Sequence, residues 1–348
     1  MMKIIFFEVP KAEQEFFKGV LSDGEVSYFE EKLSEDNVEK AKDAEIISIF
    51  VNSEVDKNVI DKMPNLKFIT TRSTGFDHID IAHCQEKRIQ VANVPAYGSQ
   101  TVAEFTFALL LTLSRRVYWG YHQLREGTNF DLSQLEGFDL EGKTLGVIGT
   151  GKIGQNVIKI AKGFGMKVIA TDPHPKEELA KQFDFGYVSL DGLLSQADVV
   201  TVHVPYLPDT HHLINSANLA KIKKGAILIN TARGEIVETE ALLAALNDGR
   251  IKGAGLDVLE AERDLKEERN IMLGSNPKVE HMENMRKLIE DHILIDLPNV
   301  VVTPHMAFFT KEAVGRIMQT TVDNIKSFIA GNVTNVVPVV EQSSLRDK

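Results

Sequence analysis

The sequence of 348 residues contains one cysteine, Cys84, and no long apolar run. A single cysteine excludes an intrachain disulfide. The absence of disulfides is typical of proteins in the reducing cytoplasm, so we expect a cytoplasmic protein. The longest apolar stretch, from Phe105 to Leu113, is far shorter than the ~20 residues that a membrane-spanning helix needs. Near the N-terminus Glu8 and Pro10 interrupt a short apolar run, which we interpret as a strand and not as a signal sequence.

Basic residues are also scarce relative to acidic ones, with 39 Lys and Arg against 50 Asp and Glu and a formal net charge of −11. This balance argues against general binding to nucleic acid or anionic membranes, although it leaves room for a small basic site. His211 and His212 are adjacent, but a zinc site would need further ligands and the chain contains only one cysteine. We therefore predict no metal site. With 43% hydrophobic and 26% charged residues, the chain is predicted to be globular and to form two domains.

Short apolar runs alternate with helical patterns, which predicts βαβ units and parallel sheets. Runs that are apolar on both faces are expected of strands covered by helices on both sides. The first part of the chain has four such runs, KIIFFEV, EIISIFV, LKFITTRS and IQVANV. From Thr144 there are six, TLGVIG, KVIATD, DVVTVHV, AILINTA, GAGLDV and NVVVTP. We interpret these six, numbered in that sequence order, as a doubly wound Rossmann sheet with strand order 3-2-1-4-5-6.

Three further segments complete the predicted fold. Ser99 is expected to cap one long, largely apolar helix, SQTVAEFTFALLLTLSRRVYWG. The highly charged segment 261–297 is longer than a strand connection needs and is predicted to be a helical insertion. A last helix, from Thr310 to Ala330 and ended by Gly331, is expected to cross back to the first domain. The predicted fold class is α/β, with two doubly wound parallel-sheet domains. A Rossmann domain (100–306) is expected to be inserted into a discontinuous, flavodoxin-like substrate domain (1–99 plus 307–348).

The run GVIGTGKIGQNV carries three glycines in the G-x-G-x-x-G spacing, between a strand and a helix. In such a turn Gly149 permits the tight bend, Gly151 lets the backbone approach a pyrophosphate, and Gly154 lets the helix pack on the strand. The N–H groups and partial positive charge of the following helix then face the phosphates. We predict that this turn, with Thr150, Lys152 and Ile153 between the glycines, binds a dinucleotide.

Asp172 ends the second strand of this domain, 18 residues after Gly154, close to the spacing expected for a ribose-binding acid. Its carboxylate would accept from both ribose hydroxyls and would repel a 2′-phosphate, so NAD is favoured over NADP. A helix cap is an alternative interpretation of Asp172, and Lys176 keeps NADP open.

Polar residues follow three runs predicted to be neighbouring strands. Arg233 follows the fourth, Glu260 and Glu262 follow the fifth, and His305 follows the sixth. Ligands of open α/β sheets bind at the carboxyl ends of strands, so these side chains are expected to gather there. Histidine can donate a proton to a reduced carbonyl, a carboxylate can fix its tautomer, and arginine can hold a substrate carboxylate by two hydrogen bonds. The set suits reversible reduction of a 2-keto acid.

The chain strongly resembles the D-isomer-specific 2-hydroxyacid dehydrogenase family along almost its whole length. The similar motifs are STGFDHID, NVPAYGSQTVAEFTFALLL, LGVIGTGKIG, HVPYLPDTHHLIN, LINTARGEIVETEALLAAL, GAGLDVLEAE and VVTPHMAFFT. The resemblance implies that Arg233 binds substrate, that Glu262 and not Glu260 pairs with the histidine, and that His305 is the acid/base. It further implies that backbone N–H groups of Ser73, Thr74 and Gly75 bind the substrate carboxylate, and that the chain forms a homodimer through the helix from Ser99.

The resemblance also implies wider cofactor and substrate sets. Asp257 is expected near the nicotinamide amide, and the remaining cofactor-binding candidates follow two strands: His203, Val204, Pro205, Thr231 and Ala232. A buried structural role is the favoured alternative for His203. Tyr97 and Phe308 are candidates for an apolar substrate pocket, with ordinary packing as the alternative.

Arg263 stands where many family members have proline. In this departure the chain resembles the D-lactate dehydrogenase branch of the family. We therefore expect NADH-dependent reduction of pyruvate, or of a close small 2-keto acid, to D-lactate. Reduction of hydroxypyruvate or glyoxylate and of 2-ketoisocaproate are alternatives within the same class. An alternative of another class is an NAD(H)-sensing scaffold that binds protein partners without turnover.

Overall fold

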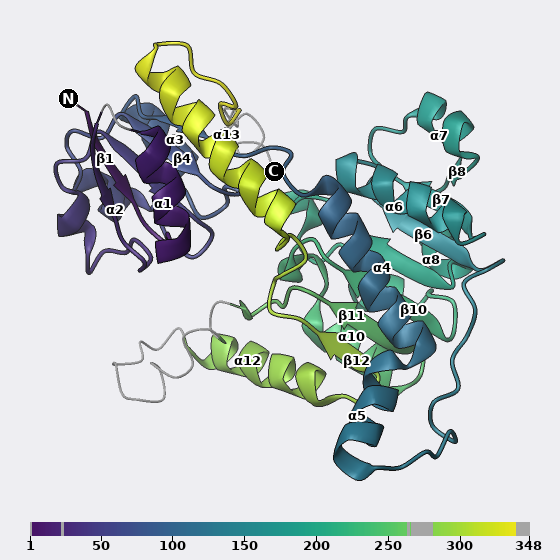
Figure 1. The fold of residues 1–348 in the computed structure, drawn as a ribbon. Coiled ribbons are helices and arrows are strands. Elements are labelled where there is room, and N and C mark those ends of the chain that lie inside the picture. Colours follow the sequence, from purple (N-terminus) through teal and green to yellow (C-terminus); the bar gives the residue numbers. More distant parts are fainter. Residues whose placement is uncertain (1, 22–23, 263–264, 266–280, 339–348) are drawn as a thin grey trace. The chain divides into compact units, whose positions relative to one another are not determined.

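The computed structural model describes residues 2–21, 24–262, 265 and 281–338. The chain divides into two compact units, one of Met1–Tyr97 with Thr310–Lys348 and one of Gly98–Phe309. Each unit contains one parallel sheet with helices on both faces (Figure 1). The predicted α/β class, with two doubly wound sheets, is therefore confirmed.

The first unit contains a five-stranded parallel sheet of order β2-β1-β3-β4-β5. This is the flavodoxin-like order 2-1-3-4-5. Four of these strands lie within the predicted apolar runs, but β2 was missed because Glu25 and Ser27 make it polar, as edge strands often are. The strands are β1 (Lys3–Phe6), β2 (Glu25–Tyr28), β3 (Ile46–Ile49), β4 (Phe68–Thr71) and β5 (Gln90–Ala92).

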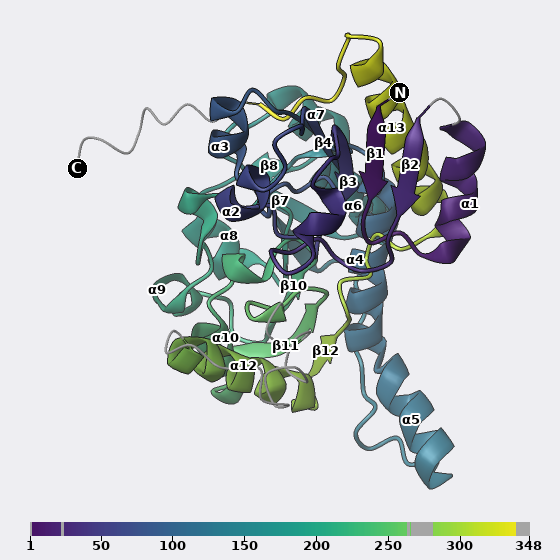
Figure 2. The same ribbon diagram turned by 90° about the vertical axis from the view of Figure 1, so that its left-hand side faces the viewer.

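Helices cover both faces of this sheet. Figure 2 shows α1 (Lys11–Val20) and α13 (Lys311–Ile329) on one face, and α2 (Lys57–Asp61) and α3 (Ile81–Glu86) on the other. A short 3₁₀ helix, Val38–Ala41, packs with the second pair. The helix α13 lies within the last helix predicted, Thr310 to Ala330, and begins after Thr310, whose side chain accepts the N–H of Ala313. It buries Val322 and Ile325 against β1 and β4.

The second unit contains a seven-stranded parallel sheet of order β12-β11-β10-β9-β6-β7-β8. The assignment of DVVTVHV as the third strand was wrong, because this run forms β9 and pairs with β6. The third strand is β8, which has only two residues, Gly186 and Tyr187, and was too short to give an apolar run. The strands are β6 (Thr144–Ile148), β7 (Lys167–Thr171), β8 (Gly186–Tyr187), β9 (Val199–Val202), β10 (Ala226–Asn230), β11 (Ile251–Leu256) and β12 (Val300–Val302).

The two faces of this sheet have separate apolar cores. One face packs against α4 (Ser99–Arg115) and α6 (Lys152–Gly163). The other packs against α8 (Leu190–Gln196), α9 (Ser216–Leu219), α10 (Thr239–Asn247) and α12 (His281–Asp296). The remaining elements are α7 (Glu177–Phe183) and two 3₁₀ helices, Pro208–Thr210 and Gly234–Ile236. Part of the predicted charged insertion, residues 263–264 and 266–280, lies outside the described residues.

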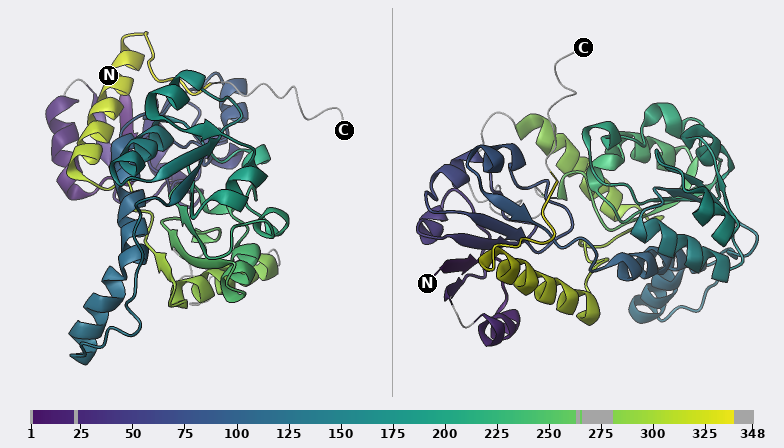
Figure 3. Two further views of the ribbon diagram at one scale, coloured as in Figure 1. Left: turned by 90° about the vertical axis from the view of Figure 1, so that its right-hand side faces the viewer. Right: turned by 90° about the horizontal axis from the view of Figure 1, so that it is seen from above.

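The single long helix predicted from Ser99 is two helices. Arg116 adopts a left-handed conformation with φ of 52° and separates α4 from α5 (Val117–Gly127). Ser99 was expected to be the cap but is the first helical residue, and Gly98 occupies the cap position. Figure 3 shows α5 extending away from the sheet of its unit, and none of its residues is buried. Among the described residues, no helix is long and apolar enough to cross a membrane.

Candidate active site

The turn between β6 and α6 has the geometry of a phosphate-binding loop. Gly149 has φ of 94°, a conformation that favours glycine. A Cβ on Gly154 would lie 2.0 Å from the carbonyl oxygen of Gly149, so only glycine allows α6 to pack this closely. A Cβ on Gly151 would meet open space at the N-terminus of the 12-residue helix. The backbone at Gly151 is therefore accessible, as an approaching pyrophosphate requires. Lys152 is exposed and Ile153 is partly buried, both in the first turn of α6.

The Asp172 carboxylate follows β7 and is held against the same turn. One oxygen accepts the N–H and the hydroxyl of Thr150, at 2.7 and 2.8 Å, and the other accepts the N–H of His174 at 2.9 Å. Partial burial opposes ionisation of Asp172, but the hydrogen bonds from Thr150 and His174 outweigh it and lower the pKa of this carboxyl. Tyr187 on β8 braces the arrangement, with its hydroxyl 3.0 Å from that of Thr150. A fixed, ionised carboxylate therefore stands beside the phosphate loop.

His203, after β9, also adjoins this loop, because its carbonyl oxygen would lie 2.8 Å from a Cβ on Gly149. Its Nε2 is 2.8 Å from the Thr201 hydroxyl, while its buried Nδ1 has no hydrogen-bond partner among the described residues. Burial lowers the pKa of His203 to about 3, so the ring is neutral at physiological pH. Val204 is partly buried and Pro205 is exposed after it.

Arg233 is positioned by the end of β10. The side chain of Asn230, itself buried, donates to the Arg233 carbonyl at 2.8 Å and accepts the N–H of Ala232 at 3.0 Å. The Arg233 guanidinium donates to the Ala232 carbonyl at 2.8 Å, which fixes its direction. The preceding Thr231 is buried and its hydroxyl lies 3.2 Å from that of Thr106 on α4. Asn230 is thus a supporting residue that the sequence interpretation missed.

Gly234 brings the segment after β11 close to Arg233. A Cβ on Gly234 would lie 2.1 Å from the carbonyl carbon and oxygen of Leu259 and 2.5 Å from the nitrogen of Glu260. Any larger residue would push the two segments apart. Glycine is needed at position 234 because its backbone lies so close to that of Leu259, which is three residues before Glu262.

Asp257, directly after β11, holds the turn that carries His305. Its carboxylate, almost fully buried, accepts the hydroxyl of Thr303 and the N–H groups of Met306 and Ala307. Burial raises the pKa of Asp257 despite these hydrogen bonds. The Asp257 carbonyl also accepts the N–H of His305, which has a left-handed φ of 52°. The carboxylate predicted to lie near the nicotinamide is therefore bonded to the turn after β12.

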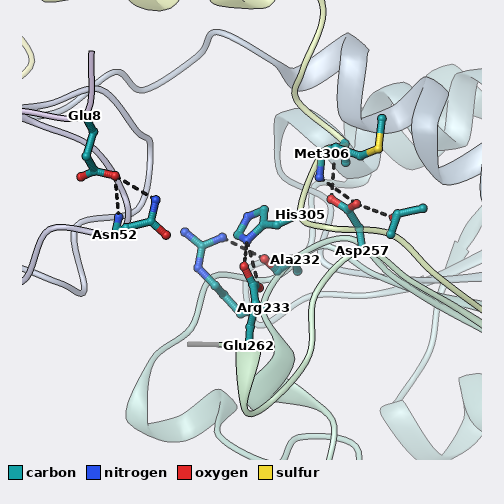
Figure 4. A network of polar contacts seen from close by, with 10 residues as sticks. Glu8, Asn52, Ala232, Arg233, Asp257, Glu262, His305 and Met306 are labelled. Carbon is teal, nitrogen blue, oxygen red and sulfur yellow. Dashed lines mark hydrogen bonds and ion pairs between the residues drawn. The ribbon is translucent and has the colours of Figure 1, made fainter. Parts of the chain in front are cut away.

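His305 and Glu262 are in hydrogen-bond contact after the carboxyl ends of β12 and β11. The Nδ1 atom of His305 lies 3.0 and 3.1 Å from the two carboxylate oxygens of Glu262. The side chains are 25% and 22% exposed, so a ligand can reach them. Because β10 pairs with β11 and β11 with β12, the three strand ends adjoin. Figure 4 shows Arg233, Glu262 and His305 projecting from these ends toward one region.

Glu260 lies apart from this contact. Its side chain is 4% exposed and is bonded to His212 Nε2 at 2.9 Å and to Lys287 Nζ at 2.7 Å. Burial opposes its ionisation, but these partners and the N–H of Thr239 lower the pKa of Glu260 to about 2. Glu262, and not Glu260, is thus the carboxylate that faces His305, and His212 is engaged in an ion pair. Among the described residues no group of three or more His, Cys, Asp or Glu is arranged to hold a metal ion.

In the first unit, the STG segment follows β4. The Ser73 hydroxyl donates to the Gly75 carbonyl at 2.6 Å, and the Thr74 hydroxyl donates to the Val94 carbonyl at 2.8 Å. Within the described chain, no acceptor is bonded to the backbone N–H groups of Ser73, Thr74 and Gly75. The segment therefore presents backbone donors, as an anion-binding loop does.

A buried arginine in the same unit was not anticipated. Arg72 is 2% exposed and donates to the carbonyls of Phe7 and Glu8 and to the Ser48 hydroxyl. Burial lowers its pKa to about 10, so it is still charged at neutral pH. Its hydrogen bonds join the carboxyl ends of β1, β3 and β4. Arg72 thereby fixes the strand ends from which the STG segment starts.

A hollow of about 530 Å³ lies at the carboxyl ends of β1, β2 and β3. The Glu8 carboxylate accepts the Asn52 side-chain amide at 2.8 Å, as Figure 4 shows, and also accepts the hydroxyl of Ser53 at 2.6 Å. Ligands of this fold type bind at the β1/β3 switch point, where the hollow lies. Its lining residues are Glu8, Pro10, Glu30, Lys32, Phe50 and Asn52.

Tyr97 and Phe308 are each partly buried. The Tyr97 carbonyl accepts the side chain of Arg316 at 2.6 Å in the first unit. In the second unit, the Phe308 ring packs edge-to-face on Phe309, with centroids 5.8 Å apart. Neither contact tests the pocket role of these two residues, which is still a prediction.

The doubly wound sheet and its glycine turn place the chain among dinucleotide-binding α/β proteins. The family model described as "D-isomer specific 2-hydroxyacid dehydrogenase, NAD binding domain" matches residues 107–307. The D-lactate dehydrogenase of Escherichia coli is 37% identical over 309 residues, which are 88% of this chain and 90% of that protein. An aromatic 2-oxoacid reductase of Clostridium sporogenes is 38% identical over 293 residues, 83% of this chain and 84% of that one.

The fold comparison agrees. The crystal structure of D-lactate dehydrogenase from Aquifex aeolicus, complexed with NAD and lactic acid, has a TM-score of 0.85 and 38% identity, and covers 94% of this chain and 96% of that one. The chain therefore belongs to the D-isomer-specific 2-hydroxyacid dehydrogenase family and is an NAD-dependent oxidoreductase similar to D-lactate dehydrogenases.

Replacing Asp172 with asparagine is expected to improve binding of NADPH relative to NADH by about 100-fold, since a carboxylate beside a 2′-phosphate costs several kcal/mol. Asparagine keeps the shape and one acceptor for the Thr150 N–H. The dissociation constants of both cofactors, measured by quenching of protein fluorescence, provide the check. Lys176→Ala is the matched control, because it removes a nearby positive charge. It should lower the affinity for NADPH and leave the affinity for NADH unchanged. An unchanged NADPH/NADH ratio in Asp172→Asn would show that the carboxylate does not select the cofactor.

Proposed function

We propose that the protein reduces pyruvate, or a close small 2-keto acid, to the D-2-hydroxy acid, and catalyses the reverse oxidation. The observation that carries this proposal is the Glu262–His305 contact at strand ends adjoining the end of β10, which carries Arg233. The similarity to D-lactate dehydrogenases supports the choice of a small substrate. The net reaction consumes one 2-keto acid, one NADH and one proton, and forms one 2-hydroxy acid and NAD⁺.

In the proposed mechanism Arg233 holds the substrate carboxylate by two parallel hydrogen bonds and polarises the adjacent carbonyl. The dinucleotide supplies a hydride to the carbonyl carbon when bound. Negative charge then develops on the carbonyl oxygen, which takes a proton from Nε2 of His305, because Nδ1 is bonded to Glu262. Glu262 fixes the ring tautomer and favours the protonated imidazole.

The other predicted residues have supporting roles in this proposal. The N–H groups of Ser73, Thr74 and Gly75 are proposed to bind the substrate carboxylate, as their open donors suggest. The phosphate loop, Asp172 and the segments 203–205 and 231–232 are proposed to hold NAD.

We also propose a homodimer in the reducing cytoplasm. Exposed apolar side chains on α5 offer a surface for a second copy of the chain; they are Val117, Tyr118, Tyr121 and Leu124. Burial raises the pKa of the Cys84 thiol to about 12, so this cysteine stays protonated and unreactive.

A steady-state screen tests the proposed reaction. Pyruvate, 2-ketobutyrate, hydroxypyruvate, 4-methyl-2-oxopentanoate and phenylpyruvate are each offered with NADH, and the product is resolved on a chiral column. We expect the highest kcat/KM with pyruvate or 2-ketobutyrate and a D product. A preference for phenylpyruvate would place the protein with the aromatic 2-oxoacid reductase instead. Binding of NADH without turnover of any keto acid would contradict the proposal and favour an NAD(H)-sensing scaffold.

Replacing Glu262 with glutamine tests the carboxylate beside His305. Removal of the negative charge disfavours the protonated imidazole, so reduction should fail at a lower pH than in the wild type. The measurement is the pH profile of kcat/KM for keto acid reduction. Glu260→Gln is the matched control, because Glu260 pairs with His212 and Lys287 instead. Identical profiles for Glu262→Gln and the wild type would rule out the pairing.

A further inference from the structure

Two side chains of the helix α12 contact the short segment that precedes Glu262. Lys287 and Asp291 are four residues apart and therefore lie on one face of the helix. The Lys287 ammonium is 2.7 Å from a carboxylate oxygen of Glu260, and the Asp291 carboxylate accepts the N–H of Ala261 at 2.9 Å. One helix face thus holds the two residues immediately before Glu262.

The contact of Asp291 is buried, whereas the Lys287 side chain is 34% exposed and its partner Glu260 is only 4% exposed. Asp291 is fully buried, and one of its oxygens has no hydrogen-bond partner among the described residues. Burial raises the pKa of Asp291 to about 7; the neighbouring Glu260 and Glu290 add to this effect, while the Ala261 N–H and His292 oppose it. A carboxyl group in such a place costs free energy, whereas a leucine would fill the space without that cost. The other carboxylate oxygen of Asp291 accepts the N–H of Ala261, and an apolar residue could not supply this acceptor.

Among the described residues, the backbone N–H of Glu262 donates to the Leu259 carbonyl over a long distance of 3.4 Å. By contrast, α12 is anchored to the unit, since Leu294 lies in the core with Leu256 and Val300. The contacts of α12 with Glu260 and Ala261 therefore link the position of Glu262 to this anchored helix.

We infer that Lys287 and Asp291 are positioning residues for the reaction, because they hold the segment 260–261 so that the Glu262 carboxylate meets Nδ1 of His305. The inference rests on the proposed function, in which His305 donates the proton. It assigns a role to the helical part of the insertion after the proposed catalytic glutamate. Neither residue touches His305, and both act through Glu262.

Asp291→Leu tests this role, with Asp291→Asn as the matched control. Leucine removes the acceptor for the Ala261 N–H, whereas asparagine keeps a carbonyl oxygen in the same place. We expect Asp291→Leu to lower kcat for keto acid reduction about 10- to 100-fold, as loss of a supporting hydrogen bond does at other sites. The affinity for NADH should be unchanged, and reduction should fail at a lower pH. Asp291→Asn should keep kcat and the pH profile of the wild type.

A readout without turnover separates positioning from mere stability. The imidazole of His305 is titrated by ¹H–¹⁵N NMR, with its signal assigned from the spectrum of His305→Gln. The charged groups around this ring include Glu262, Asp257 and Arg233, and none of them is altered in the Asp291 variants. We expect the titration midpoint to fall in Asp291→Leu and to keep its wild-type value in Asp291→Asn.

A second variant covers the outcome in which Asp291→Leu does not fold. Lys287→Met removes the ion pair with Glu260 and leaves Asp291 in place, and the midpoint of His305 should fall here too. Folded Asp291→Leu or Lys287→Met protein with the wild-type midpoint and pH profile would overturn the inference and leave the proposed function intact. A wild-type protein that reduces no keto acid would instead overturn the proposed function, while the titration would still test the contact between α12 and Glu262.

Discussion

Replacement of His305 by alanine is expected to lower kcat for keto acid reduction by about 10²- to 10⁴-fold, the range that a positioned acid or base supplies. The loss should be large because Glu262 holds the His305 ring in the turn that follows β12. The affinity for NADH should change little, since the phosphate loop and Asp172 lie after other strands, β6 and β7. Stopped-flow reduction of pyruvate gives the rate, and NADH fluorescence gives the affinity.

Two controls make this result specific to proton transfer. His305→Gln keeps a hydrogen-bond donor but exchanges no proton at neutral pH, so it should be nearly as slow as His305→Ala. His211→Ala removes a histidine that stacks on His212 and should leave kcat within about twofold of the wild type, as surface substitutions usually do. A large loss of NADH affinity in His305→Ala, with little loss of kcat, would contradict the acid/base role.

Replacement of Arg233 by lysine is expected to lower kcat/KM by about 100-fold, with KM raised and kcat lowered together. Lysine keeps the positive charge but loses the planar fork that binds a carboxylate by two hydrogen bonds. The effect falls on kcat as well as KM because the second contact also polarises the carbonyl in the transition state. Steady-state kinetics with pyruvate over a range of concentrations separates the two constants.

The matching control changes a different arginine of the same unit, which precedes the neighbouring strand β11. Arg250 pairs with Asp248 in the turn before β11, and Arg250→Lys should leave both constants unchanged. Oxamate, an unreactive analogue of pyruvate, should bind about 10- to 100-fold more weakly to Arg233→Lys, which reports the carboxylate contact alone. Equal oxamate affinity in the two proteins would mean that Arg233 does not hold the substrate carboxylate.

Much of the site could be predicted because parallel strands deliver their last residues to one edge of a sheet. Arg233, Glu262 and His305 follow three consecutive apolar runs, and those runs do pair as β10, β11 and β12. The glycine turn was equally readable, since its spacing reflects steric needs of the strand–helix junction. The choice between Glu260 and Glu262 required the family resemblance, because both glutamates follow the same strand.

Other features depend on contacts distant in sequence and carried no signal of their own. The side chains of Asn230 and Asp257 turned out to brace the turns of Arg233 and His305, yet each looks like an ordinary polar residue after a strand. The need for glycine at 234 arises from Leu259, 25 positions later. Strand order was assigned wrongly because β8 is only two residues long, so its backbone pairing with β7 leaves no apolar pattern.

The route of the chain through its two units has a consequence for how the protein is made. The core of the first unit includes Val322 and Ile325 of α13, and the buried Asn324 donates to the Asn93 carbonyl at 2.9 Å. During synthesis these residues leave the ribosome after all of Gly98–Phe309. The N-terminal sheet must therefore wait, with the face that α1 and α13 share only partly covered by α1, while the later unit is already able to fold. Chaperone binding to nascent chains should consequently fall once α13 has emerged.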